Sequence, residues 1–175
     1  MELSQAIALI NHKKIPTTQT TTWADLGCGS GLFTNALAHL LKPGSKIFAI
    51  DKSISALKKI QLPNAIQIET IQANFITEDI NINNLDGILM ANSLHYVKDK
   101  IALIHKLENY FKSSGCFLIV EYDTDKPNSW VPYPISFSLI KILFERVGYD
   151  SIKINELPSR YSHANIYGAL ILKKT

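Results

Sequence analysis

Apolar and polar positions along this chain follow two alternating periods. Short apolar runs typical of buried strands occur near residues 21–26, 45–50, 65–72, 86–91 and 116–122. Between these runs, apolar residues recur at helical spacing, which predicts helices near residues 31–41, 53–61, 99–112 and 135–147. Strands and helices that alternate in this way are typical of a parallel sheet with right-handed crossovers and helices on both faces.

The two ends of the chain add different elements. Residues 2–11 carry the apolar stripe of a short leading helix, which is either a lid over a binding site or an ordinary surface helix. Apolar segments near 151–157 and 165–173 follow each other without a helix between them, which predicts a terminal hairpin. We therefore expect a single domain over residues 1–175, with the leading helix and a polar connector in residues 1–20.

The most informative motif joins the first predicted strand to the first long helix. Asp25 ends the strand, and three glycines follow at alternate positions, namely Gly27, Gly29 and Gly31. Backbone without side chains at a helix N-terminus allows a ligand to approach closely. Asp51, twenty residues past the last glycine, closes the second predicted strand and is well placed to accept hydrogen bonds from ribose hydroxyls.

The spacing of the glycines discriminates between nucleotide-binding folds. The dinucleotide fingerprint needs a glycine where this chain has the bulky Leu32. The order acid-x-Gly-x-Gly-x-Gly, followed by Asp51, resembles the nucleotide site of class I S-adenosylmethionine-dependent methyltransferases. Residues 86–96 look like the fourth strand of that family and the loop after it, and residues 111–121 look like its helix end and fifth strand. The resemblance implies an α/β, Rossmann-like sheet of seven strands, mostly parallel, with an antiparallel strand from the C-terminal hairpin.

The resemblance also implies S-adenosyl-L-methionine as cofactor and S-adenosyl-L-homocysteine as product. The matching cofactor-binding residues are Asp25, Gly27, Cys28, Gly29, Gly31, Asp51, Lys52, Asn74, Phe75, Ala91 and Asn92. In the family, the acid at Asp25 lies near the methionyl amino group, although it also suits a role in holding the loop. Asp51 would bind the ribose, or serve as an acid at a helix N-terminus.

Two further positions concern the adenine ring and the cofactor amino group. Asn74 stands where the family often has an acid that accepts from the adenine amino group, and its side-chain oxygen can do the same. Phe75 would lie on the adenine face or serve as a core aromatic. Ala91 and Asn92 begin the loop whose backbone carbonyls approach the cofactor in the family, and Lys52 would flank the adenine with its stem.

Candidates for the acceptor side lie after the fourth and fifth predicted strands. His95 could act as a general base, with Glu121 and Tyr122 as further catalytic candidates, although an aromatic ring such as His95 also suits packing. Substrate-binding candidates are His95, Tyr96, Trp130 and Tyr133. The last two lie in the long segment 121–134, which contains three prolines and would either line the acceptor pocket or cap the sheet.

Composition limits the function classes. The chain has 175 residues, of which 46% are apolar and 19% charged, as in ordinary globular domains. No apolar run approaches the roughly 20 residues that span a bilayer, and the N-terminus lacks a basic signal-peptide start. Cys28 and Cys116 suggest neither a disulfide nor a metal site, so we expect a cytoplasmic protein without metal. The net charge of +3 is mild, and the scattered lysines suggest solvated faces.

These observations favour an S-adenosylmethionine-dependent methyltransferase that acts on a small molecule, without membrane partners, as a monomer or weak homodimer. The Asn/Asp-Pro-Pro-aromatic signature of nucleobase amino-methyltransferases and a Pro-Cys nucleophile are both absent, which disfavours DNA as the acceptor. Three alternatives remain open: a non-catalytic partner subunit with the same fold, an RNA or protein methyltransferase, and an NAD-linked oxidoreductase. The sequence does not reveal the acceptor or the acceptor atom.

Overall fold

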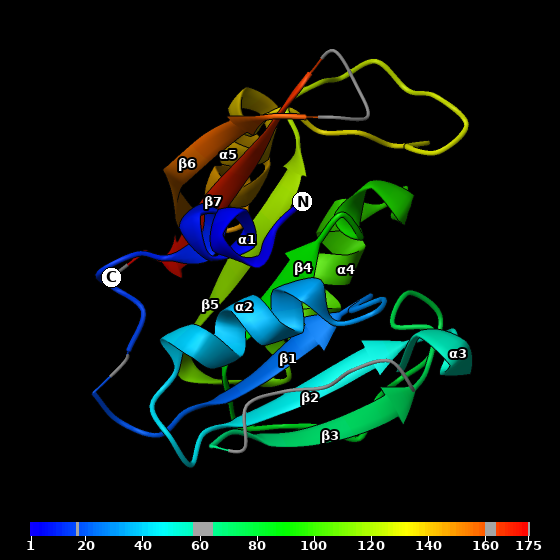
Figure 1. Ribbon diagram of the computed structural model, residues 1–175. Helices are drawn as coiled ribbons and strands as arrows, with labels where there is room; N and C mark the ends of the chain where they lie inside the picture. Colours follow the sequence, from blue (N-terminus) through cyan, green and yellow to red (C-terminus); the bar gives the residue numbers. More distant parts are fainter. Residues whose placement is uncertain (17, 58–64, 160–163, 175) are drawn as a thin grey trace.

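A seven-stranded sheet in the order β3-β2-β1-β4-β5-β7-β6 forms the centre of the computed structural model, which describes residues 1–16, 18–57, 65–159 and 164–174 (Figure 1). The strands are β1 (Thr22–Leu26), β2 (Lys46–Asp51), β3 (Gln67–Gln72), β4 (Leu85–Ala91), β5 (Phe111–Tyr122), β6 (Tyr149–Pro158) and β7 (Asn165–Lys173). The first five strands are parallel, whereas β7 pairs antiparallel with both β5 and β6. The predicted sheet and its antiparallel terminal hairpin are therefore confirmed.

Helices cover both faces of this sheet. They are α1 (Leu3–Ile10), α2 (Leu32–Leu40), α3 (Ile54–Leu57), the 3₁₀ helix η1 (Leu94–Tyr96), α4 (Lys100–Glu108) and α5 (Phe137–Arg146). Figure 1 shows α1 and α2 on one face and α4 and α5 on the other. Two separate apolar clusters correspond to these two layers, one containing α1 and α2 side chains and the other α4 and α5 side chains. Of the helix expected near 53–61, residues 58–61 lie outside the described residues.

Apolar packing between neighbouring strands holds the middle of the sheet. Trp23 on β1 is fully buried, and its indole covers Gly87 on β4, where a Cβ atom would lie only 2.1 Å from the ring. On the opposite face, the Phe117 ring of β5 packs against Phe144 of α5 and against Tyr149 of β6. These contacts fix the relative positions of the strand ends from which the site is built.

One predicted boundary is wrong. The helix expected over residues 99–112 ends at Glu108, and residues 111–114, expected as helix end, belong to β5. Phe111 pairs with Leu85 of β4, and its ring lies over Gly115, where a Cβ atom would come within 2.2 Å. The Phe111 ring also meets Phe117 edge-on, so tertiary packing overrides the helical pattern of this short segment.

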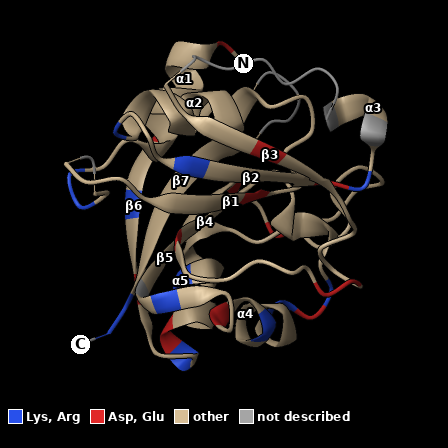
Figure 2. Cartoon of the chain, turned by 90° about the horizontal axis from the view of Figure 1, so that it is seen from below, with Lys and Arg blue, Asp and Glu red and all other residues tan. Residues whose placement is uncertain are grey.

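Charged side chains are dispersed over the surface. Figure 2 shows blue and red segments spread over several elements, without one continuous basic stripe in this view. Several lysines pair with carboxylates on neighbouring elements, such as Lys46 with Glu69 and Lys112 with Asp86. Within the described parts of the chain, no helix combines the length and apolar character that crossing a membrane requires.

Candidate functional site

The glycine loop lies at the carboxyl end of β1, in the middle of the sheet. The backbone N–H groups of Gly27 and Cys28 both donate to the carbonyl of Ile50 on β2, at 2.8 and 3.0 Å. A Cβ atom on Gly27 would come within 2.7 Å of the Ser93 Cβ atom, so the loop also packs closely on the residues after β4. Ser93 closes this contact by donating from its hydroxyl to the carbonyl of Leu26 at 2.7 Å. The loop is therefore fixed from both neighbouring strands.

Asp51 connects the end of β2 to this loop. One carboxylate oxygen accepts from the N–H of Gly29 at 2.9 Å, and the other accepts from the N–H of Ser53 at 2.8 Å. Each oxygen has a second lone pair, so the carboxylate keeps the capacity to accept from a ligand as well. The two interpretations made from the sequence, a binding acid and a structural acid, are thus compatible in one side chain.

Asp25 lies beneath the loop and is only 1% exposed. Its Oδ2 atom accepts from the Thr34 hydroxyl at 2.6 Å, whereas its buried Oδ1 atom has no hydrogen-bond partner. Burial raises the pKa of this carboxyl from 3.8 to about 7, and the nearby charge of Asp51 adds to the rise, against the opposing hydrogen bond from Thr34. A buried, unpartnered oxygen of this kind is costly unless a ligand or water supplies a donor.

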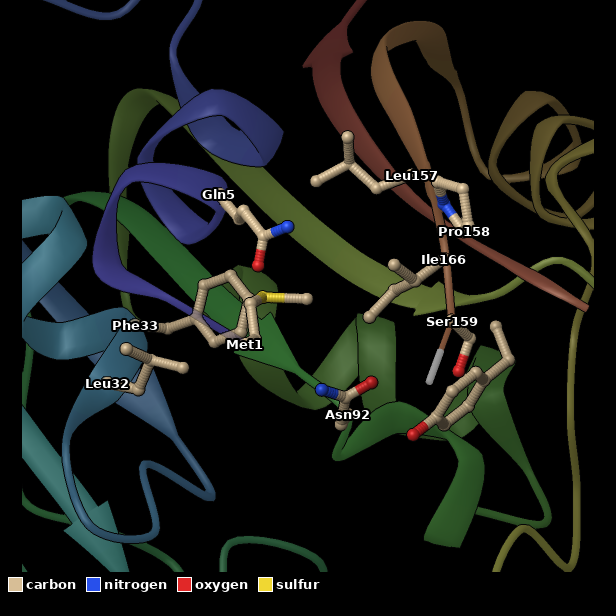
Figure 3. Close-up of a pocket in the computed structure, with 10 residues that line it drawn as sticks. Met1, Gln5, Leu32, Phe33, Asn92, Leu157, Pro158, Ser159 and Ile166 are labelled. Atoms are coloured by element: carbon tan, nitrogen blue, oxygen red, sulfur yellow. The ribbon is translucent and has the colours of Figure 1, made fainter. Parts of the chain in front are cut away.

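Two cavities adjoin at this end of the sheet. The first, of about 270 Å³, lies over the ends of β1, β2, β3 and β4, and its wall includes Gly27, Asp51, Lys52, Ala73, Asn74, Phe75, Ile76, Asn92, Ser93 and Tyr96. The second, of about 110 Å³, is enclosed by α1, α2, β5 and the β6–β7 hairpin (Figure 3). Asn92 lines both cavities, and its side-chain oxygen is buried without a partner. Asn92 also has a positive φ of 53°, a conformation that often marks functional positions.

This combination of a seven-stranded sheet, a glycine loop and an acid after β2 was compared with known proteins. A family model described as a methyltransferase domain matches residues 18–159. This chain belongs to that methyltransferase family. Over 105 residues it is 31% identical to "Putative methyltransferase 235L" of Invertebrate iridescent virus 6, a match that covers 57% of this chain and 36% of the viral protein. The chain therefore spans about a third of the length of that curated relative.

The chain also has the same fold as solved methyltransferase structures. It is similar to a SAM-dependent methyltransferase from Aquifex aeolicus, with 16% identity, a TM-score of 0.68 and 99% coverage of both chains. It is also similar to 1,6-didemethyltoxoflavin-N1-methyltransferase from Burkholderia thailandensis, with 15% identity and a TM-score of 0.73. That match covers 99% of this chain and 78% of the other, whose structure contains 1,6-didemethyltoxoflavin and S-adenosylhomocysteine. The predicted class I methyltransferase fold is thus confirmed.

Most residues predicted for the cofactor gather around the larger cavity. Gly27, Asp51, Lys52, Asn74, Phe75 and Asn92 all line it. The side-chain oxygen of Asn74 already accepts from the N–H of Ile76 at 3.2 Å. Phe75 belongs to the apolar core and also lines the cavity, where its contact with adenine stays a prediction. Cys28 differs, because its side chain packs with Ala49 and does not line the cavity. Ala91 packs against the α1–α2 cluster.

The candidate general base His95 is paired with Glu121 inside the protein. Nδ1 of His95 lies 2.7 Å from one Glu121 oxygen, and the backbone N–H of His95 donates to the other at 3.1 Å. The two side chains are 3% and 1% exposed, and neither lines the two cavities described above. The structure therefore places this pair behind the site, where it holds the loop that carries Asn92 and Tyr96.

Of the segment 121–134, expected to line the acceptor pocket, only Tyr122 lines one of the two cavities. The Asn128 side chain accepts from the N–H of Trp130 within the segment, and the Asp125 side chain accepts from the N–H of Ser136 at the start of α5. Tyr133 donates its N–H to the His95 carbonyl. Trp130 is 80% exposed and Tyr133 41% exposed, and neither lines either cavity. Of the four acceptor-side candidates, only Tyr96 borders the larger cavity, whereas the catalytic candidate Tyr122 borders the smaller one.

Several residues at or beneath the two cavities were not predicted from the sequence. Thr34 gave a weak signal, as a hydroxyl in the first turn of α2 close to Asp25. Ser93 and Ile76 gave none, nor did the residues of the smaller cavity, which are Met1, Gln5, Leu32, Phe33, Leu157, Pro158, Ser159 and Ile166. Among the described residues, no group of three or more His, Cys, Asp and Glu side chains is placed to hold a metal ion.

The raised pKa of Asp25 predicts a pH-dependent stability. The folded state binds this proton more tightly than the unfolded chain does, so the stabilisation is complete below pH 4 and is lost as the pH rises through about 7. Between pH 5 and 8, the free protein should lose about 3 kcal/mol from this group. Urea unfolding of wild type and Asp25→Asn over this range measures it. Parallel pH profiles for the two proteins would show that Asp25 does not titrate there.

Proposed function

We propose that this methyltransferase domain binds S-adenosylmethionine in the larger cavity and transfers the methyl group to a small-molecule acceptor. The observation that carries the proposal is the arrangement around the glycine loop. This end of the sheet carries the Asp51 carboxylate with free lone pairs, the open backbone of Gly29 and the buried, unpartnered Oδ1 atom of Asp25. In open α/β sheets, ligands bind at this edge, outside the carboxyl ends of the strands.

The acceptor groups at this site fit such a cofactor. Asp51 would accept from the ribose hydroxyls, and Asn74 and Phe75 would contact the adenine ring. The unpartnered Oδ1 atom of Asp25 would receive the methionyl amino group, directly or through water, and a positive charge there would favour the ionised carboxyl. Around Gly29 there is open space, since no atom lies within 4 Å of a Cβ placed on it. This space suits the methionine part of the cofactor.

The catalytic work of the chain would be alignment. When bound, S-adenosylmethionine supplies a methyl group on a positively charged sulfur, which leaves as a neutral thioether. The residues around Asn92 would hold cofactor and acceptor in line, because Asn92 borders both cavities. Leu32 and Phe33, at the start of α2, would exclude water from the space between the cofactor and the acceptor.

A small molecule is the acceptor that we favour over RNA or protein. The second cavity measures only about 110 Å³ and is bounded by elements from both ends of the chain. A continuous basic stripe on a protein surface favours nucleic-acid binding. The described surface shows no such stripe in the view of Figure 2. The intact loop contacts of Asp51 favour an enzyme over a non-catalytic partner subunit. We further propose that the domain acts as a monomer or weak homodimer.

A matched pair of glycine substitutions tests the cofactor site. Gly29 and Gly148 both have positive φ, 53° and 86°, and both have open space around an added Cβ atom. Alanine should therefore cost each protein about 1 kcal/mol of backbone strain. Only Gly29→Ala should weaken S-adenosylhomocysteine binding, by about tenfold or more, because its methyl group enters the space assigned to the ligand.

Isothermal titration calorimetry measures this difference, and NADH serves as the competing nucleotide. Binding of S-adenosylhomocysteine that is equal in Gly29→Ala and Gly148→Ala would place the cofactor elsewhere. Binding of NADH without S-adenosylhomocysteine would favour the oxidoreductase.

A further inference from the structure

The smaller cavity has a chemical character of its own. Its walls are mainly apolar, including Leu32 and Phe33 from α2 and Leu157 and Ile166 from the terminal hairpin (Figure 3). Among the described residues that line it, none has a charged side chain; the polar side chains are those of Gln5, Asn92, Tyr122 and Ser159. A cation placed against these described residues would lose its hydration without gaining a counter-charge, whereas an anion could still meet the α-ammonium group of Met1, which also lines the cavity.

One polar atom of the wall has no partner within the protein. The Oδ1 atom of Asn92 is buried and accepts no hydrogen bond, although its residue adopts the strained positive-φ conformation that places it between the two cavities. By contrast, the side-chain oxygen of Gln5 already accepts from the N–H of Glu2 at 3.0 Å. A ligand with an N–H or O–H group beside Asn92 would satisfy this buried, unpaired oxygen.

We propose that the smaller cavity is the acceptor site and that it selects a small, ring-sized molecule without a positive charge and with an N–H or O–H donor facing Asn92. This inference deepens the proposed function and rests on it. It also assigns acceptor specificity to α1, the start of α2 and the β6–β7 hairpin, instead of the Trp130 segment. Leu32, whose bulk excludes a dinucleotide fingerprint, acquires a second role as a wall of this site.

Four probes of similar size separate the charge of the ligand from its hydrogen-bond donor. Benzamide is uncharged and has N–H donors, acetophenone is uncharged and has none, benzoate is an anion and benzylammonium a cation. The affinities are measured by NMR titration of the protein saturated with S-adenosylhomocysteine. We expect benzamide to bind several-fold more tightly than acetophenone and benzoate, which lack a donor, and at least about tenfold more tightly than the benzylammonium cation.

A cavity-filling variant and a matched control locate the binding. Leu157→Trp places an indole in the cavity wall and should abolish benzamide binding, whereas Leu139→Trp makes the same change on the exposed face of α5 and should not. S-adenosylhomocysteine affinity should stay within about twofold of wild type in both.

The outcomes separate the two proposals. If wild type fails to bind S-adenosylhomocysteine, the proposed function and this inference both fail. If S-adenosylhomocysteine binds but the four probes bind equally, or benzamide still binds to Leu157→Trp, only the inference about the acceptor is overturned.

Discussion

Asp51→Ala should weaken S-adenosylhomocysteine binding about 100-fold or more. The variant would lose the hydrogen bonds between the Asp51 carboxylate and the ribose, each worth about 1.5–3 kcal/mol for a charged acceptor. It would also release the N–H groups of Gly29 and Ser53, which it now holds at 2.9 and 2.8 Å. The loop that receives the methionine part would therefore be less well fixed in the free protein. Titration calorimetry of the purified variant gives the affinity directly.

Two control variants distinguish loss of the ligand contact from loss of structure. Asp99→Ala removes another aspartate that accepts a backbone N–H, that of Ala102 at 2.9 Å, at the exposed start of α4. It should cost about 1 kcal/mol of stability and leave the affinity unchanged. Asp51→Asn keeps one oxygen and should bind with intermediate affinity. If Asp51→Ala and Asp99→Ala bind S-adenosylhomocysteine with equal affinity, Asp51 does not contact the cofactor.

The residues that gather around the glycine loop and the larger cavity could be predicted because their signals are local in sequence. Gly27, Gly29 and Asp51 carry roles that depend on backbone shape and on the end of a single strand, and a short motif specifies both. The sheet order follows from the same regularity, since alternating strands and helices permit few right-handed arrangements. The misplaced boundary at Glu108 shows the limit, because the start of β5 depends on Phe111 packing over Gly115, a contact within the folded sheet.

The acceptor side could not be predicted in the same way. Gln5, Leu32 and Ile166 are far apart in the chain and meet only because α1 packs beside α2 and the terminal hairpin returns next to β5. None of these residues has a type or spacing that indicates binding. The exposed aromatics near residue 130 gave a stronger sequence signal, yet the structure directs Trp130 into solvent.

The histidine that the sequence offers as a general base, His95, is buried in a pair with Glu121. Both Glu121 oxygens are used, one by the imidazole and one by the His95 backbone. Lys100, also buried, donates to the carbonyls of Val97 and Tyr133 at 2.8 Å, which ties the same loop to the segment after β5. A loop held at so many points is suited to present Asn92 and Tyr96 at fixed positions.

Gly168→Ala should produce the largest loss of stability among the variants considered. Gly168 lies on β7 directly beneath α1, and a Cβ atom there would come 1.7 Å from the backbone carbonyl oxygen of Leu9. Because the obstacle is backbone, no side-chain rotation relieves it, and α1 must move. Ala6, Leu9 and Ile10 of this helix are fully buried, so the displacement should cost about 3 kcal/mol or more. For a chain of this size, that corresponds to a melting temperature about 10 °C lower.

The same substitution also tests what α1 does. Since Gln5 lines the acceptor cavity and no α1 residue lines the larger one, Gly168→Ala should abolish benzamide binding and preserve most S-adenosylhomocysteine binding at a temperature where the protein is folded. Gly148→Ala, whose added methyl group has open space, serves as the control and should retain both ligands. Parallel loss of both ligands in Gly168→Ala would instead make α1 a lid over the cofactor, and loss of neither would leave it an ordinary surface helix.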